Sequence, residues 1–148
     1  MEESINMCEQ IKQIFNIDDI DIKTVSPLTL AYIGDSIYDL IIRTIVVCKG
    51  NKQVNKMHKE VSSLVKAHGQ VLMYEATEDI LTEEEKIIFK RGRNAKSYTS
   101  AKNATKIDYR KATGYEALLG YLYLENKMDR IFEIVATGID KVTFEMEE

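Results

Sequence analysis

The 148-residue sequence contains few residues that interrupt regular structure, with one proline and seven glycines. This scarcity argues against a fold of many short strands and favours long helices. No stretch approaches the ~18 apolar residues of a membrane span. The start, MEESINMCEQIKQIF, also lacks the basic beginning and continuous apolar core of a signal peptide. These absences predict a cytoplasmic protein without membrane contact.

Cysteine and histidine are equally scarce. Cys8 and Cys48 have no metal-ligand spacing, and neither His58 nor His68 has a cysteine beside it. Reduced structural thiols and solvated histidines are the simplest interpretation of this pattern. The sequence therefore gives no indication of a zinc site.

Charge is distributed unevenly along the chain, although the net charge is only −4. From Lys86 to Lys111 there are nine basic residues and one acid, Asp108, so this segment carries +8 and the remainder −12. A local field of this strength attracts phosphates. The piece RGRNAKSYTSAKNAT also mixes basic residues with hydrogen-bonding side chains and Tyr98, which favours contact with nucleic acid. A solvated lysine-rich loop is the alternative.

Apolar residues recur at three- and four-residue spacing and predict a chain of helices. Ser26-Pro27 is a helix start, and Thr82 to Glu85 forms a capping box. The predicted helices cover residues 4–15, 26–49, 52–66, 68–79, 82–91, 109–125 and 128–143, and residues 92–108 are predicted to be a long basic connection. With no repeat or linker, we expect one all-α domain over residues 1–148, a helical bundle.

Two carboxylates lie in strongly apolar helices, Asp35 in LTLAYIGDSIYDLIIRTIVV and Glu116 in YEALLGYLYLE. A carboxylate near a core needs a partner or a cation. Both have small neighbours, including Gly34 and Gly120, which would let the two helices cross closely and bring the acids together. Such a pair suits a hard cation, Mg²⁺ or Mn²⁺. From local sequence alone, acids at the edge of amphipathic helices are an equal alternative.

Asp39 follows Asp35 by one helical turn. It could support the same site, or pair with Arg43 at the i,i+4 spacing of helical ion pairs. The ion pair is the favoured interpretation.

The string AYIGDSIYDL resembles the signature of the ribonuclease III family, and GYEALLGYLYLE resembles that family's second catalytic helix. Further strings resemble the short branch, Mini-ribonuclease III, which has no separate double-stranded-RNA-binding domain. These strings are MHKEVSSLVKA, KRGRNAKS, Tyr109-Arg110 and LLGYLYLENK. The resemblance extends from about Leu28 to Lys127.

The resemblance implies a metal-dependent endoribonuclease that cuts double-stranded RNA, with Asp35 and Glu116 as catalytic metal ligands. It implies Mg²⁺ as cofactor, with Mn²⁺ as a substitute, and a homodimer in which each subunit cuts one strand. The branch is associated with maturation of large-subunit (23S) ribosomal RNA precursors, and a ribosomal protein is a conceivable cofactor. The residues expected to bind RNA are Lys90, Arg91, Arg93, Asn94, Lys96, Ser97, Lys102 and Arg110.

The chain departs from larger ribonuclease III enzymes at two positions. Those enzymes have acids where this chain has Ala31 and Thr113. Fewer fixed charges predict weaker metal binding and greater reliance on water or substrate phosphates as ligands, and put a two-metal mechanism in doubt.

Two other functions compete with the nuclease. A non-catalytic RNA-binding module would be expected to lose the metal-binding acids, whereas this chain keeps Asp35 and Glu116. An all-α interaction protein would use both acids structurally, and fold alone does not exclude it.

Overall fold

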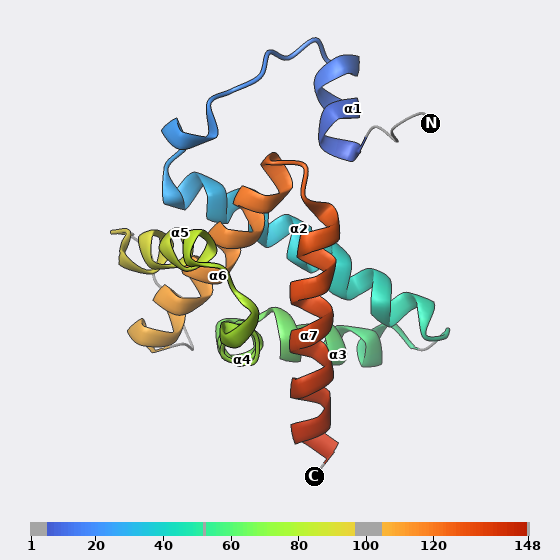
Figure 1. Ribbon diagram of the computed structural model, residues 1–148. Helices are drawn as coiled ribbons and strands as arrows, with labels where there is room; N and C mark the ends of the chain where they lie inside the picture. Colours follow the sequence, from blue (N-terminus) through green and yellow to red (C-terminus); the bar gives the residue numbers. More distant parts are fainter. Residues whose placement is uncertain (1–5, 52, 97–104, 148) are drawn as a thin grey trace.

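The computed structural model describes residues 6–51, 53–96 and 105–147, and side chains as far as Val142 (Figure 1). Its α-helices are α1 (Met7–Ile14), α2 (Pro27–Cys48), α3 (Val54–Val65), α4 (Ala67–Glu75), α5 (Glu83–Asn94), α6 (Lys106–Leu124) and α7 (Met128–Glu147). Two short 3-10 helices, η1 (Ile22–Thr24) and η2 (Glu78–Ile80), complete the order. The described residues contain no strand, which confirms the predicted all-α fold.

Local capping chemistry sets the starts of the two most regular predicted helices. The side chain of Ser26 accepts a hydrogen bond from the Thr29 backbone N–H ahead of Pro27. At the start of α5, the Thr82 hydroxyl accepts from the Glu85 backbone, and the Glu85 carboxylate accepts from the Thr82 N–H at 2.9 Å. Both caps satisfy backbone donors that would otherwise lack partners. Both predicted starts are confirmed.

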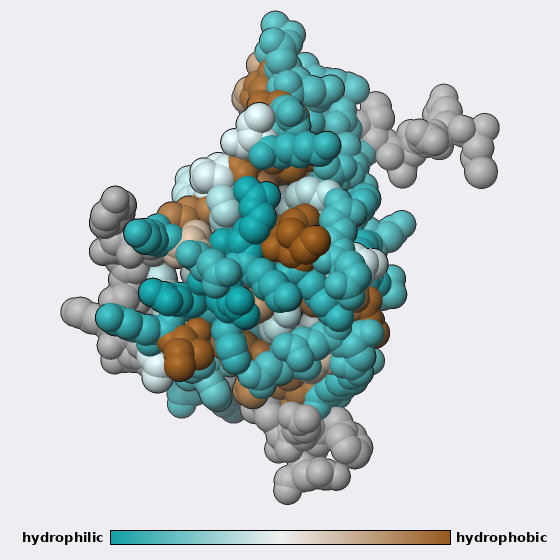
Figure 2. Space-filling view, turned by 60° about the vertical axis from the view of Figure 1, so that its left-hand side comes forward, coloured by the Kyte–Doolittle hydropathy of each residue, from teal (hydrophilic) through white to brown (hydrophobic). Residues whose placement is uncertain are grey.

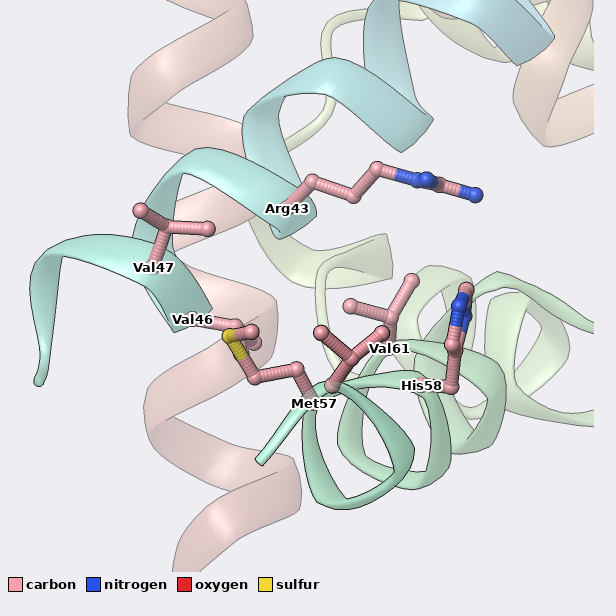
Figure 3. Close-up of a pocket in the computed structure, with 7 residues that line it drawn as sticks. Arg43, Val46, Val47, Met57, His58 and Val61 are labelled. Atoms are coloured by element: carbon pink, nitrogen blue, oxygen red, sulfur yellow. The ribbon is translucent and has the colours of Figure 1, made fainter. Parts of the chain in front are cut away.

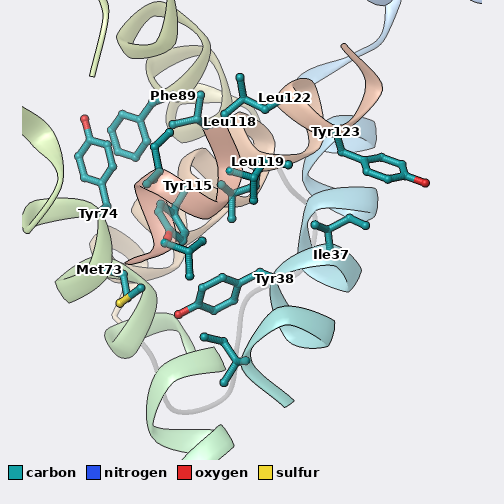
Figure 4. Packing of buried hydrophobic residues seen from close by; sticks show 14 of the residues in the cluster. Ile37, Tyr38, Met73, Tyr74, Phe89, Tyr115, Leu118, Leu119, Leu122 and Tyr123 are labelled. Atoms are coloured by element: carbon teal, nitrogen blue, oxygen red, sulfur yellow. The ribbon is translucent and has the colours of Figure 1, made fainter. Parts of the chain in front are cut away.

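The hydrophobic core lies around α2 and α6, which cross at the centre of the molecule (Figure 1). Tyr38 from α2 and Tyr115 from α6 are fully buried and pack edge to face, with ring centroids 5.4 Å apart (Figure 4). Phe89 of α5 stacks on Tyr74 of α4 with centroids 3.6 Å apart. The four aromatic residues belong to one hydrophobic cluster, which contains side chains from α2, α4, α5 and α6.

An ion pair connects α5 to α7. Glu85 is buried and accepts from Nε and Nη2 of Arg130, and the same Nη2 also donates to the Ile80 carbonyl at 2.6 Å. Beside this positive group the pKa of Glu85 is below its usual value, although burial alone would raise it. The carboxylate that caps α5 therefore also fixes the position of α7.

The predicted connection over 92–108 was wrong at both ends. The helix α5 continues through Gly92 to Asn94, and α6 already begins at Lys106. Gly92 lies inside α5, where the helix packs directly against α6. A Cβ there would lie 2.8 Å from the Ala117 Cβ and 2.9 Å from the Gly114 Cα of α6. Glycine is thus needed for close packing of the two helices, at some cost in helix propensity.

The other boundaries differ from the prediction by a few residues. The helix α4 ends at Glu75 instead of residue 79, α1 is shorter than 4–15, and α7 runs to Glu147. The helix α1 lies near the turn between α6 and α7, where the Asn126 side chain donates to the Glu9 carboxylate at 3.1 Å, and its Cys8 is buried in the core. Among the described residues, no helix combines the length and apolar character needed to cross a membrane.

Candidate active site

Glycines allow α2 and α6 to cross with their main chains in contact. A Cβ on Gly34 would overlap the carbonyl group of Glu116, and a Cβ on Gly120 would overlap that of Leu30. Two small residues, one on each helix, therefore sit where the helices meet. This confirms the close crossing expected from the sequence, and it places Asp35 next to Glu116 because each adjoins the contact.

Both carboxylates line one open hollow of about 550 Å³, which we call the carboxylate hollow. Its walls come from α2, α4 and α6, and from Val65 at the end of α3. The lining residues used below are Ala31, Tyr32, Asp35, Gln70, Thr113 and Glu116. Asp35 is exposed, contrary to the expected place near the core, whereas Glu116 is partly buried. The structure thus brings the two predicted acids together at a concave surface open to solvent.

The environment of Glu116 disfavours its negative charge. Burial, the adjacent charge of Asp35 and a hydrogen bond between the two carboxyl groups together raise the pKa of Glu116 to about 8. At neutral pH the raised pKa favours the protonated, neutral form of the Glu116 carboxyl group. Two carboxylates held this close gain most from a positive partner that replaces the proton.

Asp39 belongs to a different part of α2. Its Oδ2 accepts from Nε of Arg43 at 2.9 Å, which confirms the favoured ion pair. Arg43 in turn lines a smaller, mainly apolar pocket of about 140 Å³ between α2 and α3, with Val46, Met57 and His58 (Figure 3). Asp39 does not line the carboxylate hollow.

The donors at the hollow fit a hard cation that retains water ligands. Asp35 and Glu116 supply carboxylate oxygens, the preferred ligands of Mg²⁺ and Mn²⁺. Ala31 and Thr113 line the same hollow and add no carboxylate to it. Within the part of the chain that is described, no group of three or more His, Cys, Asp or Glu could hold a metal. Mg²⁺ tolerates this because it binds through one or two carboxylates and keeps several waters.

Four of the residues predicted to bind RNA lie at the carboxyl end of α5, and two of them, Arg93 and Asn94, were predicted to lie in the connection after it. Lys90, Arg91 and Asn94 line a shallow hollow of about 490 Å³ beside Pro27 of α2. A Cβ at Gly92 would also lie 3.2 Å from the carbonyl oxygen of Thr113. The basic end of α5 is therefore a direct neighbour of the carboxylate hollow. Figure 2, with the α5 side turned forward, shows a largely hydrophilic face.

The remaining predicted RNA-binding residues differ in their surroundings. Arg93 is half-buried, with its guanidinium carbon 5.9 Å from the Phe89 ring centroid and its Nε donating to the Asn94 side chain at 3.2 Å. Lys96 and Arg110 are exposed. Ser97 and Lys102 lie outside the described residues.

Sequence reasoning missed Gln70. This residue is only 3% exposed, lies on α4 and lines the carboxylate hollow with Asp35 and Glu116. The available signal was a glutamine inside the apolar run AHGQVLMY. A buried amide needs hydrogen-bond partners, so its position in that run was informative.

Comparison with known proteins gives one consistent result. The Ribonuclease III domain family matches residues 28–127, which include both carboxylates. The chain is 50% identical to Mini-ribonuclease 3 of Clostridium tetani, over 81% of this chain and 80% of that protein. It is 44% identical to Mini-ribonuclease 3 of Enterococcus faecalis, over 82% of this chain and 94% of that protein.

A solved structure extends the similarity to three dimensions. The crystal structure of a protein from Fusobacterium nucleatum superposes with a TM-score of 0.74 at 34% sequence identity. The superposition covers 83% of this chain and 98% of that one. The helical arrangement that joins α2 to α6 is therefore shared with an experimentally determined fold.

Proposed function

Because the chain belongs to the ribonuclease III family, and is an endoribonuclease of that type, we propose that it cuts double-stranded RNA at the carboxylate hollow. Asp35 and Glu116 are the proposed catalytic residues and hold one divalent cation, Mg²⁺ or, as a substitute, Mn²⁺. The observation that carries this proposal is the convergence of the two acids on one hollow, with the pKa of Glu116 raised beside Asp35.

The cation would polarise the phosphate and lower the pKa of the attacking water. The protein's own contribution is to position this chemistry. The Gly34 contact fixes the main chain of α2 against Glu116, so the two carboxyl groups keep their separation. To hold a cation, Glu116 would have to release its proton, so cation binding would depend on pH.

The basic end of α5 is the proposed holding surface for the RNA backbone. Lys90 and Arg91 line the shallow hollow beside Pro27, and their charges match the phosphates of a duplex. The deep, narrow major groove of A-form RNA prevents side chains from reading its bases. Contacts to phosphates and 2′-hydroxyl groups are therefore expected to dominate, with strong dependence on salt.

A homodimer is part of the proposal, because one cation site cuts one strand and a duplex has two. Its support is an apolar stripe on α2, formed by Tyr32, Leu40 and Val47, which are 80%, 54% and 60% exposed. They lie eight and seven residues apart on one side of the helix, with the polar Ser36 and Arg43 between them. Their exposed apolar area supports the use of this side of α2 as an interaction surface. Tyr32 also lines the carboxylate hollow, so the stripe adjoins the proposed active site.

The natural substrate we propose is a precursor of 23S ribosomal RNA, processed in the cytoplasm, with a ribosomal protein as an optional cofactor. The support is the similarity to Mini-ribonuclease 3 proteins. Cys8 and Cys48 are free thiols, which agrees with a reducing compartment.

The decisive experiment is cleavage of end-labelled duplex RNA by the wild type, Asp35→Asn and Glu116→Gln, with Mg²⁺ and with EDTA. We expect cutting only by the wild type and only with Mg²⁺, while circular dichroism shows all three proteins folded. Asp39→Asn is the matched control, since Asp39 lies on the same helix outside the hollow, and it should retain activity. Undiminished cutting by Asp35→Asn would remove that residue from the mechanism.

A further inference from the structure

The nitrogen of the Gln70 side-chain amide has a hydrogen-bond partner within the fold. Gln70 lies at the start of α4, just after the break between α3 and α4. Its Nε2 donates to the carbonyl oxygen of Val65 at 2.7 Å. Because a carbonyl oxygen only accepts, this bond settles which end of the amide is nitrogen. The oxygen, Oε1, must accept from another group.

Oε1 of Gln70 has no donor among the residues that the structure describes. The break between α3 and α4 does not explain why Oε1 lacks a donor, because the backbone carbonyl groups at the break already accept hydrogen bonds from other side-chain atoms. The hydroxyl of Tyr38 donates to the Leu64 carbonyl at 2.8 Å, and Gln70 Nε2 serves Val65. A buried acceptor without a donor is costly, and such groups in native proteins call for a specific explanation.

The position of Gln70 supplies that explanation. The residue forms part of the wall of the carboxylate hollow, together with Asp35 and Glu116. One other buried side-chain atom in the described region lacks a partner, the hydroxyl of Tyr115. Tyr115 is fully buried in the core and does not line the hollow, so a ligand entering there would not meet it. Gln70 thus joins an unpaired acceptor to the proposed reaction site.

We propose that Oε1 of Gln70 accepts a hydrogen bond from an O–H group of a ligand that enters the carboxylate hollow. The inference rests on the proposed function, which brings two such donors there. One is a water molecule bound to the cation, and the other is a 2′-hydroxyl group of the RNA. Both offer the same chemistry to the amide oxygen, and they can be distinguished by supplying one without the other.

The first measurement is the Mn²⁺ affinity of the RNA-free protein, by isothermal titration calorimetry. Gln70→Met removes the acceptor at similar side-chain length, and should weaken Mn²⁺ binding by about tenfold if the donor is a cation-bound water. Gln70→Glu keeps an acceptor but no longer donates to Val65, and should bind Mn²⁺ at least as tightly as the wild type.

The second measurement is RNA binding without divalent cations, using a duplex RNA and the same duplex with one strand 2′-deoxy. If the donor is a 2′-hydroxyl, the wild type should prefer the RNA duplex, and Gln70→Met should lose several-fold of that preference. Tyr115→Phe removes the other unpaired atom and should leave both measurements unchanged.

The inference is overturned if Gln70→Met changes neither measurement, or if Gln70→Glu loses as much as Gln70→Met in both. The second result would mean that the only role of the Gln70 amide is its hydrogen bond to the Val65 carbonyl. Asp35→Asn tests the proposed function separately, because it should abolish Mn²⁺ binding. Binding lost in Asp35→Asn but unchanged in Gln70→Met would reject the Gln70 inference and leave the cation site intact.

Discussion

Gly34 of α2 faces the main-chain carbonyl of Glu116 in α6 with no space for a side chain between them. The acid that completes the proposed cation site is therefore also the residue on which the neighbouring helix rests. Any group inserted at this contact must separate the helices and move Asp35 away from Glu116. Stability and activity should be coupled at this single position.

Gly34→Ala should lower the free energy of unfolding by about 1–3 kcal/mol, the usual range for overpacking, and reduce cleavage. The control is Gly138→Ala on α7, where the added Cβ would meet mainly the flexible end of Met73, 2.8 Å from its Cε. That variant should lie within about 1 kcal/mol of the wild type, because alanine also favours helix. Urea unfolding compares the two, and equal losses would contradict the main-chain contact.

The contribution of Glu116 to the stability of the metal-free protein should fall as pH rises from about 4.5 to about 8. In the folded protein Glu116 keeps its proton across this range because its pKa is raised to about 8. The unfolded chain releases the proton near the ordinary value of 4.5. The folded state therefore binds more protons in this window, and linkage makes unfolding easier as pH increases.

Urea unfolding in EDTA at several pH values measures this effect. Glu116→Gln cannot titrate at this position, so its stability should decline less over the same interval. Asp39→Asn should keep the wild-type decline. Parallel curves for the wild type and Glu116→Gln would show that burial beside Asp35 does not hold the proton.

Two arginines on the same helix should behave differently. Arg91→Ala should weaken duplex binding and lower the salt slope by on the order of one unit for each phosphate that the variant no longer neutralises. Arg93→Ala should mainly reduce stability, because Arg93 is half-buried over the Phe89 ring. Lys141→Ala, which removes the partner of Asp79, is the control for a basic residue on α7. Binding measured at several salt concentrations tests the difference, and an unchanged slope in Arg91→Ala would place the RNA elsewhere.

Leu40→Asp should convert the proposed homodimer to a monomer and reduce double-strand cutting. The introduced charge would lie within the apolar stripe of α2, where desolvation on association is unfavourable. Ile14→Asp is the control, since Ile14 is 77% exposed on α1 and lies outside the stripe. Sedimentation equilibrium gives the mass of each variant. A dimer that survives Leu40→Asp but not Ile14→Asp would move the interface to α1.

The sequence by itself determined the features that depend on neighbours along the chain. Ser26 and Thr82 cap their helices through residues three positions away, so a short string predicts each start. The periodicity of apolar residues predicted an all-α fold. Gly34 and Gly120 predicted the close crossing of α2 and α6, because the sequence itself gives the side-chain size of the residues near each acid.

Only the tertiary structure decided the features that depend on distant neighbours. Gly92 looked like a helix end, yet contact with Gly114 and Ala117 keeps it inside α5. The raised pKa of Glu116 depends in part on Asp35, eighty-one residues away in sequence. The unpaired oxygen of Gln70 suggests a role in ligand binding only because the fold places Gln70 in the same hollow as both acids. Capping and periodicity act within a few residues, whereas burial and electrostatics depend on which segments the fold brings together.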